Sequence, residues 1–145
     1  MPNKTHKGEM HYRAVKKTRK ANTGCGFCGF DSEGKKGEVV SSYKYFWLVN
    51  NIFSYDIWDD QGVIDHLMLV PKRHVDSVGD MNDEELLEYS KILGAYDKLG
   101  YSIYARSSGN VIKSVLHQHT HLLKLDGKEI SFMLYNKKPY LLVKK

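Results

Sequence analysis

The chain has 145 residues, of which 41% are hydrophobic, and it contains three prolines, two cysteines and a formal net charge of +5. A chain of this length buries roughly 68–70% of its unfolded surface in one globular core, so it needs no disulfide framework. No segment approaches the ~20 apolar residues of a membrane span, and the N-terminus lacks the apolar core of a secretory signal. We therefore predict a cytoplasmic protein of one domain.

Positive charge is concentrated at the N-terminus. Residues 1–20 carry seven basic side chains and one acidic side chain, and the rest of the chain has a net charge of −1. We predict that residues 1–22 form a basic, flexible leader and that residues 23–145 form the domain. Such a leader could bind nucleic acid by counterion release, but no aromatic interleaving or nucleic-acid-binding module accompanies it, so a solvated leader is the favoured interpretation.

Both cysteines, Cys25 and Cys28, lie in a glycine-rich knuckle over residues 23–30. Glycine lets the backbone fold tightly around a small group. A lone pair of cysteines with this spacing indicates metal or redox chemistry. The two thiols supply half of a tetrahedral zinc site, and the alternatives are a redox dithiol or two small buried side chains.

The next segments predict strands. Residues 38–50 are rich in Val, Tyr, Phe and Trp, which is typical of one or two strands. The aspartate-rich segment 51–65 is interpreted as a loop. Residues 66–70 are apolar after the histidine and predict a short strand that Pro71 ends.

A helix is predicted over residues 82–99. Asn82 and Glu85 have the spacing of a capping box, acidic residues occupy the first turn, and Gly100 ends the helix. The apolar stripe at helical spacing consists of Leu86, Tyr89, Leu93 and Tyr96. This stripe indicates ordinary core packing.

Beyond the helix, residues 101–106 and 115–125 predict strands, and residues 129–144 predict a hairpin that turns at 136–139. The predicted fold class is therefore α+β, with a mainly antiparallel sheet packed against one main helix.

Three histidines alternate along the predicted strand 115–125: His117, His119 and His121. Because side chains alternate in a strand, we expect the three imidazoles on one face at a spacing of about 7 Å. Such a row can coordinate a metal that activates water. Alternatively, one imidazole attacks phosphorus while its neighbours stabilise charge on the phosphoryl oxygens. Spacing alone does not decide between these uses.

Three motifs resemble the histidine triad (HIT) superfamily, and they follow one another along the chain in the family's order. The segment His117-Gln-His-Thr-His-Leu-Leu123 resembles its His-x-His-x-His signature, and Asp65-His-Leu-Met-Leu-Val-Pro-Lys-Arg-His74 resembles its Gly-His-x-Leu-Val-x-Pro-Lys-x-His stretch. Cys25-Gly-Phe-Cys28 is similar to the zinc knuckle of many bacterial members. The resemblance covers residues 25–125. It implies a HIT-like fold with the triad on a central strand, and many relatives form homodimers.

The resemblance implies a hydrolase or nucleotidyl transferase acting on nucleoside phosphoramidates or dinucleoside polyphosphates. By position, His119 would be the nucleophile, and His121 and His66 would contact phosphate oxygens. Ser114 would touch the phosphate or the leaving group. Because ideal alternation puts Ser114 on the face opposite His119, we expect a twist or bulge before the triad. Several converging imidazoles neutralise the charge of phosphoryl transfer without a metal.

The resemblance also implies a structural zinc site. In zinc-bearing relatives the two remaining ligands are the last histidine of the Pro-Lys-x-His stretch and the first triad histidine. Those positions are His74 and His117, which would join Cys25 and Cys28.

The nucleoside pocket is less defined by the motifs. Asn51 resembles the position at which relatives place an Asn or Asp on the ribose hydroxyls, and Asn50 is an adjacent alternative. Phe53 and Tyr55 suit either a nucleobase or the core.

Five positions depart from the family pattern. Asp65 replaces a glycine, Lys113 replaces a glutamine, and Arg106 stands where some relatives carry an active-site asparagine. Gln118 and Thr120 replace apolar residues, which predicts a wetter face of the triad strand. We expect these departures to affect substrate preference first. A catalytically weak nucleotide- or nucleic-acid-binding zinc module is the alternative to an enzyme.

Overall fold

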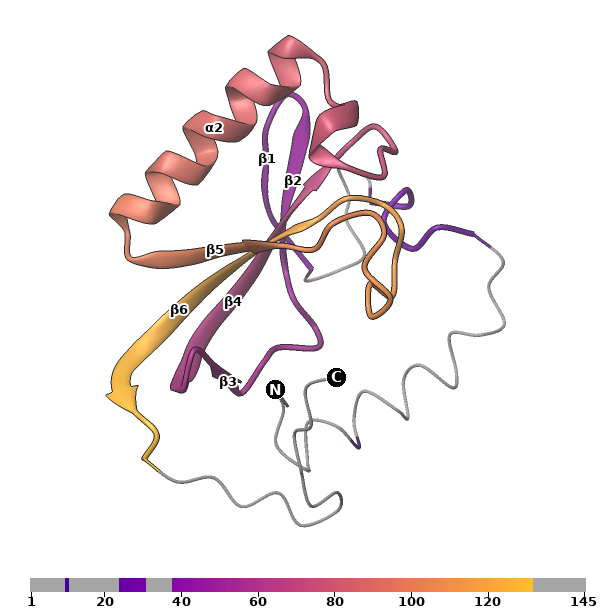
Figure 1. Ribbon diagram of the computed structural model, residues 1–145. Coiled ribbons are helices and arrows are strands. Elements are labelled where there is room, and N and C mark those ends of the chain that lie inside the picture. Colours follow the sequence, from indigo (N-terminus) through magenta and orange to yellow (C-terminus); the bar gives the residue numbers. More distant parts are fainter. Residues whose placement is uncertain (1–9, 11–23, 31–37, 132–145) are drawn as a thin grey trace.

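The computed structural model describes Met10, residues 24–30 and residues 38–131 (Figure 1). One antiparallel sheet holds the strands β1 (Val39–Ser42), β2 (Phe46–Asn50), β3 (Ile57–Trp58), β4 (Gln61–Pro71), β5 (Tyr101–Ala105) and β6 (Thr120–Glu129). A short 3₁₀ helix, η1 (Val78–Asp80), precedes the long helix α2 (Asp83–Lys98). The predicted α+β fold class is confirmed.

The order of the main strands is β1-β2-β4-β6-β5, and β3 pairs with β4. Every pairing is antiparallel. His121 on β6 lies opposite Met68 on β4 and opposite Tyr104 on β5. Directly opposed residues share a face of a sheet, so the register brings side chains from three strands together around His121.

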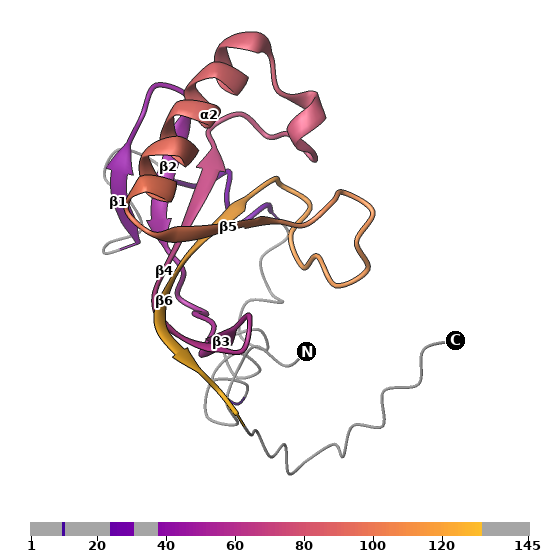
Figure 2. The same cartoon turned by 60° about the vertical axis from the view of Figure 1, so that its left-hand side comes forward.

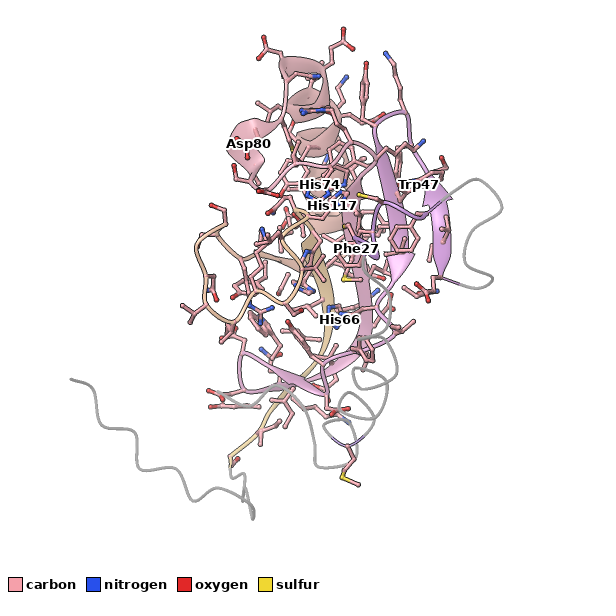
Figure 3. All side chains as sticks on the ribbon, turned by 90° about the vertical axis from the view of Figure 1, so that its right-hand side faces the viewer. Phe27, Trp47, His66, His74, Asp80 and His117 are labelled. Atoms are coloured by element: carbon pink, nitrogen blue, oxygen red, sulfur yellow. The ribbon has the colours of Figure 1, made fainter. Side chains whose placement is uncertain are left out.

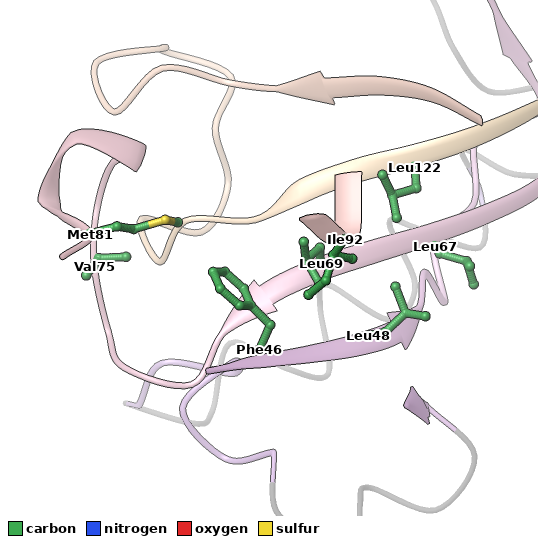
Figure 4. Packing of buried hydrophobic residues seen from close by; sticks show 8 residues of the cluster. All are labelled: Phe46, Leu48, Leu67, Leu69, Val75, Met81, Ile92 and Leu122. Atoms are coloured by element: carbon green, nitrogen blue, oxygen red, sulfur yellow. The ribbon is translucent and has the colours of Figure 1, made fainter. Parts of the chain in front are cut away.

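The two faces of the sheet pack against different partners. The cluster on the α2 side consists of Phe46, Leu48, Leu67, Leu69, Val75, Met81, Ile92 and Leu122 (Figure 4). The cluster on the other face consists of Phe30, Trp47, Val49, Met68 and Val70. His66 shares the parity of Met68 on β4, and His121 lies opposite Met68. The histidines of the sheet therefore lie on the face away from α2.

Helix α2 begins and ends as predicted. The Asn82 side chain accepts a hydrogen bond from the Glu85 N–H, and the Glu85 carboxylate accepts one from the Asn82 N–H, each at 2.9 Å. This reciprocal pair is the predicted capping box. Gly100, with φ of +83°, follows the helix in the left-handed region that glycine adopts without strain. The predicted stripe packs on the core, and Ile92, beside the stripe on α2, is buried in that core.

The prediction of a loop over residues 51–65 is wrong after residue 56. β3 and β4 form a hairpin whose two turn residues, Asp59 and Asp60, have φ of 49° and 55°. Positive φ at both central residues is the conformation of a tight two-residue hairpin turn. The aspartates therefore mark a turn within the sheet, and the short strand predicted over 66–70 is the end of β4 (Gln61–Pro71).

The prediction of a triad strand over residues 115–125 is also wrong at its start. β6 begins at Thr120, so His121 lies in the strand while His117 and His119 precede it. The Gln118 N–H is donated to the Val75 carbonyl at 2.7 Å, beyond the end of β4. The start of the triad segment therefore forms a hydrogen bond to the chain that follows β4 and is not part of the ladder between β4 and β6.

The predicted leader, except Met10, and the predicted hairpin beyond residue 131 lie outside the described residues. Among the residues that are described, no helix has the length and apolarity needed to cross a membrane.

Glu85 also links α2 to the segment that carries His74. Its two carboxylate oxygens accept hydrogen bonds from Arg73 Nε at 3.0 Å and from an Arg73 terminal nitrogen at 2.7 Å. The Arg73 hydrogen bonds lower the pKa of Glu85 and outweigh its burial. Folding therefore favours the carboxylate, and this contribution is present above the unfolded pKa of about 4.3 and is lost as the pH falls through the folded pKa.

We expect Glu85→Gln to lower stability at pH 7 by about 1.5–3 kcal/mol, because hydrogen bonds to a buried charged group are lost. Thermal melts of both proteins from pH 7 to pH 3 measure the effect, and the difference should narrow below about pH 4.5. Asp83→Asn is the matched control, since it removes an exposed carboxylate from the same helical turn. A difference that does not depend on pH would contradict the assignment.

Candidate functional site

Four side chains with metal-ligating atoms meet on the knuckle side of the sheet. The ligand atoms of Cys25, Cys28, His74 and His117 all lie within 4.8 Å of one another. Figure 3 shows His74 and His117 side by side, and their ring centroids are 4.5 Å apart. The structure thus brings together the four residues that the family resemblance implied.

The cluster has the dimensions and orientation of a zinc site. His74 Nδ1 lies 3.1 Å from Cys28 Sγ, and His117 Nδ1 lies 3.5 Å from the sulfurs of both Cys25 and Cys28. A tetrahedral zinc ion holds sulfur and nitrogen ligands about 3.5 Å apart.

The other ring nitrogens of the two histidines point to acceptors. His117 Nε2 is 2.9 Å from the Pro71 carbonyl, and His74 Nε2 is 3.2 Å from an Asp76 carboxylate oxygen. Zinc-bound histidines characteristically donate the second N–H in this way, which leaves the facing nitrogen free to coordinate. Burial lowers the pKa of His117, which favours the neutral ring that a ligand requires.

The knuckle also contacts the middle histidine. The Phe27 ring lies edge-on to His119 at 5.1 Å and to His117 at 6.0 Å, and in Figure 3 it lies between the His74 and His117 pair and His66. Phe27 stacks on Phe30, which is buried in the cluster on this face. No motif in the sequence points to Phe27, because its position depends on how the knuckle packs on the sheet.

His119 is buried and has a defined tautomer. Its Nδ1 donates a hydrogen bond of 2.9 Å to the His117 carbonyl, so Nε2 keeps the lone pair of the neutral ring. Burial lowers the pKa of His119, and the positive charges of Lys113 and Arg106 act in the same direction. The ring is therefore neutral near pH 7 and has a nucleophilic nitrogen.

His66 and His121 form a bonded pair beside His119. His66 Nε2 lies 2.9 Å from His121 Nδ1, and the ring of His121 lies 5.1 Å from that of His119. The Tyr55 N–H is donated to His66 Nδ1 at 3.0 Å. The neutral His66 ring thus carries its proton on Nε2, donates it to His121 Nδ1, and leaves the His121 proton on Nε2.

Asn51 and Ser114 have different surroundings. Asn51 Nδ2 lies 3.0 Å from His66 Nε2, and Asn51 Oδ1 accepts the Phe53 N–H at 2.9 Å. Its predicted contact with ribose stays a prediction.

Ser114 is exposed in the loop between β5 and β6, which extends beyond the ends of both strands (Figure 2). Because Ser114 precedes the strand, the alternation argument does not apply to it and no bulge is needed.

Aromatic rings surround the His66 and His121 pair. Tyr55 is buried, with its ring 4.5 Å from His66 and 5.3 Å from His121. Trp58 stacks on Tyr55, and Tyr104 lies 6.0 Å from His121. The packing supports a core position for Tyr55. No motif in the sequence points to Trp58 and Tyr104, because only the strand register brings them to the site.

The predicted wetter face is wrong. Gln118 and Thr120 are buried, and hydrogen bonds satisfy both. Lys113 Nζ donates to Gln118 Oε1 at 3.0 Å, and the Thr120 hydroxyl lies 2.7 Å from the Tyr89 hydroxyl on α2. These hydrogen bonds hold the triad segment to Lys113 and to Tyr89 of α2, and the two side chains are shielded from water.

Asp65, which replaces a glycine, has a structural partner. The Tyr101 hydroxyl donates to Asp65 Oδ2 at 2.5 Å across β6, and this bond is the main cause that raises the pKa of Tyr101 to about 12. The carboxylate therefore joins β4 to β5.

Solved structures resemble this chain over most of its length. A HIT family hydrolase from Legionella pneumophila is 24% identical, with a TM-score of 0.52, over 75% of this chain and 97% of that one. A zinc-bound histidine triad family protein from Mycobacterium smegmatis is 17% identical, with a TM-score of 0.54, over 74% of this chain and 80% of that one. The chain has the HIT fold. This confirms, at the level of fold, the resemblance seen in the sequence.

A third similar structure is the diadenosine triphosphate hydrolase of Plasmodium falciparum in complex with cyclomarin A. It is 17% identical, with a TM-score of 0.51, over 66% of each chain. No protein family model matches the sequence, and no curated protein matches it. The HIT fold thus rests on the structure and on the three motifs.

Proposed function

We propose that this HIT-fold protein is a nucleotide hydrolase or nucleotidyl transferase that acts at the α-phosphate of phosphoramidates or dinucleoside polyphosphates. His119 is the nucleophile, and His66, His121 and Ser114 contact the phosphate or the leaving group. Two of the similar proteins are a HIT family hydrolase and a diadenosine triphosphate hydrolase, which supports this class of reaction.

The orientation of His119 carries the proposal. Its Nδ1–H is held by the His117 carbonyl at 2.9 Å, which reserves the Nε2 lone pair for an electrophile. His121 Nε2–H is a donor beside it for an oxygen that gains charge in the transition state, and His66 orients the His121 ring by donating to its Nδ1. A neutral nucleophile beside oriented donors suits phosphoryl transfer, in which positioning and charge stabilisation supply most of the catalysis.

The reaction then has two displacements. In the first, the Nε2 lone pair forms a P–N bond and the bond from phosphorus to the leaving group breaks, with its electron pair going to the leaving group. In the second, water or another acceptor forms a new P–O bond and loses its proton, and the P–N electron pair returns to Nε2. Dividing one difficult substitution in this way is the advantage of a covalent intermediate.

The Cys25, Cys28, His74 and His117 cluster would hold zinc. Four protein ligands leave no open position for an activated water, so the chemistry that zinc supplies is structural. With zinc bound, His117, whose carbonyl accepts the hydrogen bond of His119, and the knuckle that carries Phe27 would both be held in place.

The proposed function is tested by incubating the full chain with adenosine 5′-phosphoramidate and with dinucleoside polyphosphates, and by separating the products chromatographically. We expect steady turnover of at least one substrate, with mononucleotide as product. A thermal-shift survey of the same compounds measures binding, since a ligand at 100 times its Kd adds about 2.7 kcal/mol of stability. Binding without turnover would contradict the enzyme and favour the alternative, a nucleotide-binding zinc module.

The homodimer, the cytoplasmic location and the contact of the basic leader with nucleic acid stay predictions. A salt-sensitive affinity for oligonucleotides that is lost on deletion of residues 1–22 would support the last of these.

A further inference from the structure

Arg106 lies at the edge of the triad site, where the family pattern has a different residue type. It follows β5, whose register pairs Ala105 with Thr120 and Tyr104 with His121. Arg106 and His119 each lie one residue beyond the last pair of this ladder. The Arg106 guanidinium lies over the Tyr104 ring, and that ring stacks on His121, so the guanidinium is on the side of the sheet that carries the histidines.

The guanidinium of Arg106 has an unused donor at this position. Its Cζ lies 5.5 Å from the centre of the Tyr104 ring, and that ring lies against His121. Its Nε is buried, and no acceptor for it is found within the described part of the chain. A buried N–H without an acceptor is costly, so a residue that keeps one beside a cluster of imidazoles indicates a ligand that supplies the acceptor.

The local charge favours an anionic ligand. Lys113 and Arg106 both act on His119 as positive charges. Lys113 is tethered, since its Nζ donates to the Asp76 carbonyl at 2.8 Å and to Gln118 Oε1 at 3.0 Å. Arg106 Nε is a buried donor without an acceptor in the described part of the chain, whereas two of the three Lys113 N–H donors are used. A planar guanidinium fork also matches the oxygens of a phosphate group.

We propose that Arg106 is a specificity-determining residue that binds a phosphate of the leaving group, so that the site prefers polyphosphate substrates over phosphoramidates. This inference rests on the proposed function. When the bond to a polyphosphate breaks, the electron pair leaves on a phosphate oxygen that gains negative charge, and Arg106 neutralises it. An amine leaving group departs neutral after taking a proton, and it gains nothing from a guanidinium.

The first test compares kcat/KM for diadenosine triphosphate and adenosine 5′-phosphoramidate in wild type and in Arg106→Gln. We expect the polyphosphate value to fall about 10–100-fold, as for the loss of a charge-assisted hydrogen bond, and the phosphoramidate value to change less than about 3-fold. Arg106→Lys keeps the charge but loses the fork, so it should restore the polyphosphate value only in part. Lys91→Gln, which removes one positive charge from the exposed surface of α2, should leave both values unchanged. An equal fall for both substrates, or no fall, would overturn the proposal.

The second test does not depend on turnover. Calorimetry measures tripolyphosphate binding to the His119→Ala protein with and without Arg106→Gln, and with Lys91→Gln as the matched loss of charge. We expect only Arg106→Gln to weaken binding, by about tenfold or more. Unchanged affinity would overturn the role of Arg106 even in an active enzyme. If the wild type turns over no nucleotide while this effect of Arg106 persists, the proposed function fails and the anion site stands.

Discussion

Replacing His119 with alanine is expected to abolish turnover, with a loss of kcat of about 10⁴-fold or more, because no other group provides the attacking lone pair. Nucleotide binding should survive, since the other contacts of the site remain. Rapid quench with a slowly leaving substrate, followed by mass spectrometry, should detect a nucleotidyl adduct on His119 of the wild type and none in the variant.

The control for this experiment is a test that the variant is still folded. His119 is buried, so thermal melts and circular dichroism of His119→Ala must show a folded protein before its activity is compared. His119→Asn is a second variant with a polar side chain that can replace the hydrogen bond to the His117 carbonyl. A fully active His119→Asn protein would end the covalent mechanism.

His66 and His121 are expected to matter less than His119. His121 donates to the phosphate in the proposed mechanism and His66 orients the His121 ring, and loss of one oriented donor costs about 10²–10³-fold in kcat. The two residues are also bonded to each other at 2.9 Å, so the double variant should lose less than the product of the single effects. Steady-state kinetics of the three variants measures this coupling.

Removal of zinc is expected to have the second largest effect, on stability before activity. The purified protein should hold one zinc per chain, and Cys25→Ser with Cys28→Ser should remove it. Zinc binding contributes folding free energy, so we expect the melting temperature to fall by about 10 °C or more, the shift that a few kcal/mol cause in a domain of this size.

Elemental analysis of chelator-washed protein measures the metal content, and activity is followed in parallel. Zinc that persists in the double cysteine variant would contradict the proposed ligands. Activity that disappears on chelation while the melting temperature stays constant would instead support a metal-activated water. The distances within the cluster and the four protein ligands favour a structural zinc, whose removal lowers the melting temperature.

Local sequence signals predicted the elements whose cause is local. The helix was predicted to within a residue at each end, because the Asn82 and Glu85 capping box and the glycine after Leu99 act within one turn. The hairpin of β3 and β4 was missed because its local signal is ambiguous. Two aspartates in positive φ form its turn, and aspartate is as common in loops as in turns.

The triad segment shows what a strand pattern misses. Alternating histidines predicted one strand, but residues 117–119 are bonded to the chain around Pro71 and Val75. Those partners are more than 40 positions away, and no alternation within the segment encodes them. The bond to Pro71 holds the His117 ring with Nδ1 toward the sulfurs, whereas the His119 ring is held by the local bond from its Nδ1 to the His117 carbonyl.

The sequence by itself determined the types of chemistry in this protein: two thiols, a set of imidazoles and one capped helix, in the order of a HIT protein. The motifs already named His74 and His117 as partners of the two thiols, and only the tertiary structure showed that His66 and His121 form a bonded pair. Only it placed the Arg106 guanidinium over Tyr104, beside the histidines, and buried Gln118 and Thr120, the latter against Tyr89 of α2. The reason is physical. Residue types and local spacing are carried by neighbouring positions, whereas tautomers, burial and free donors depend on strands that pair across the whole chain.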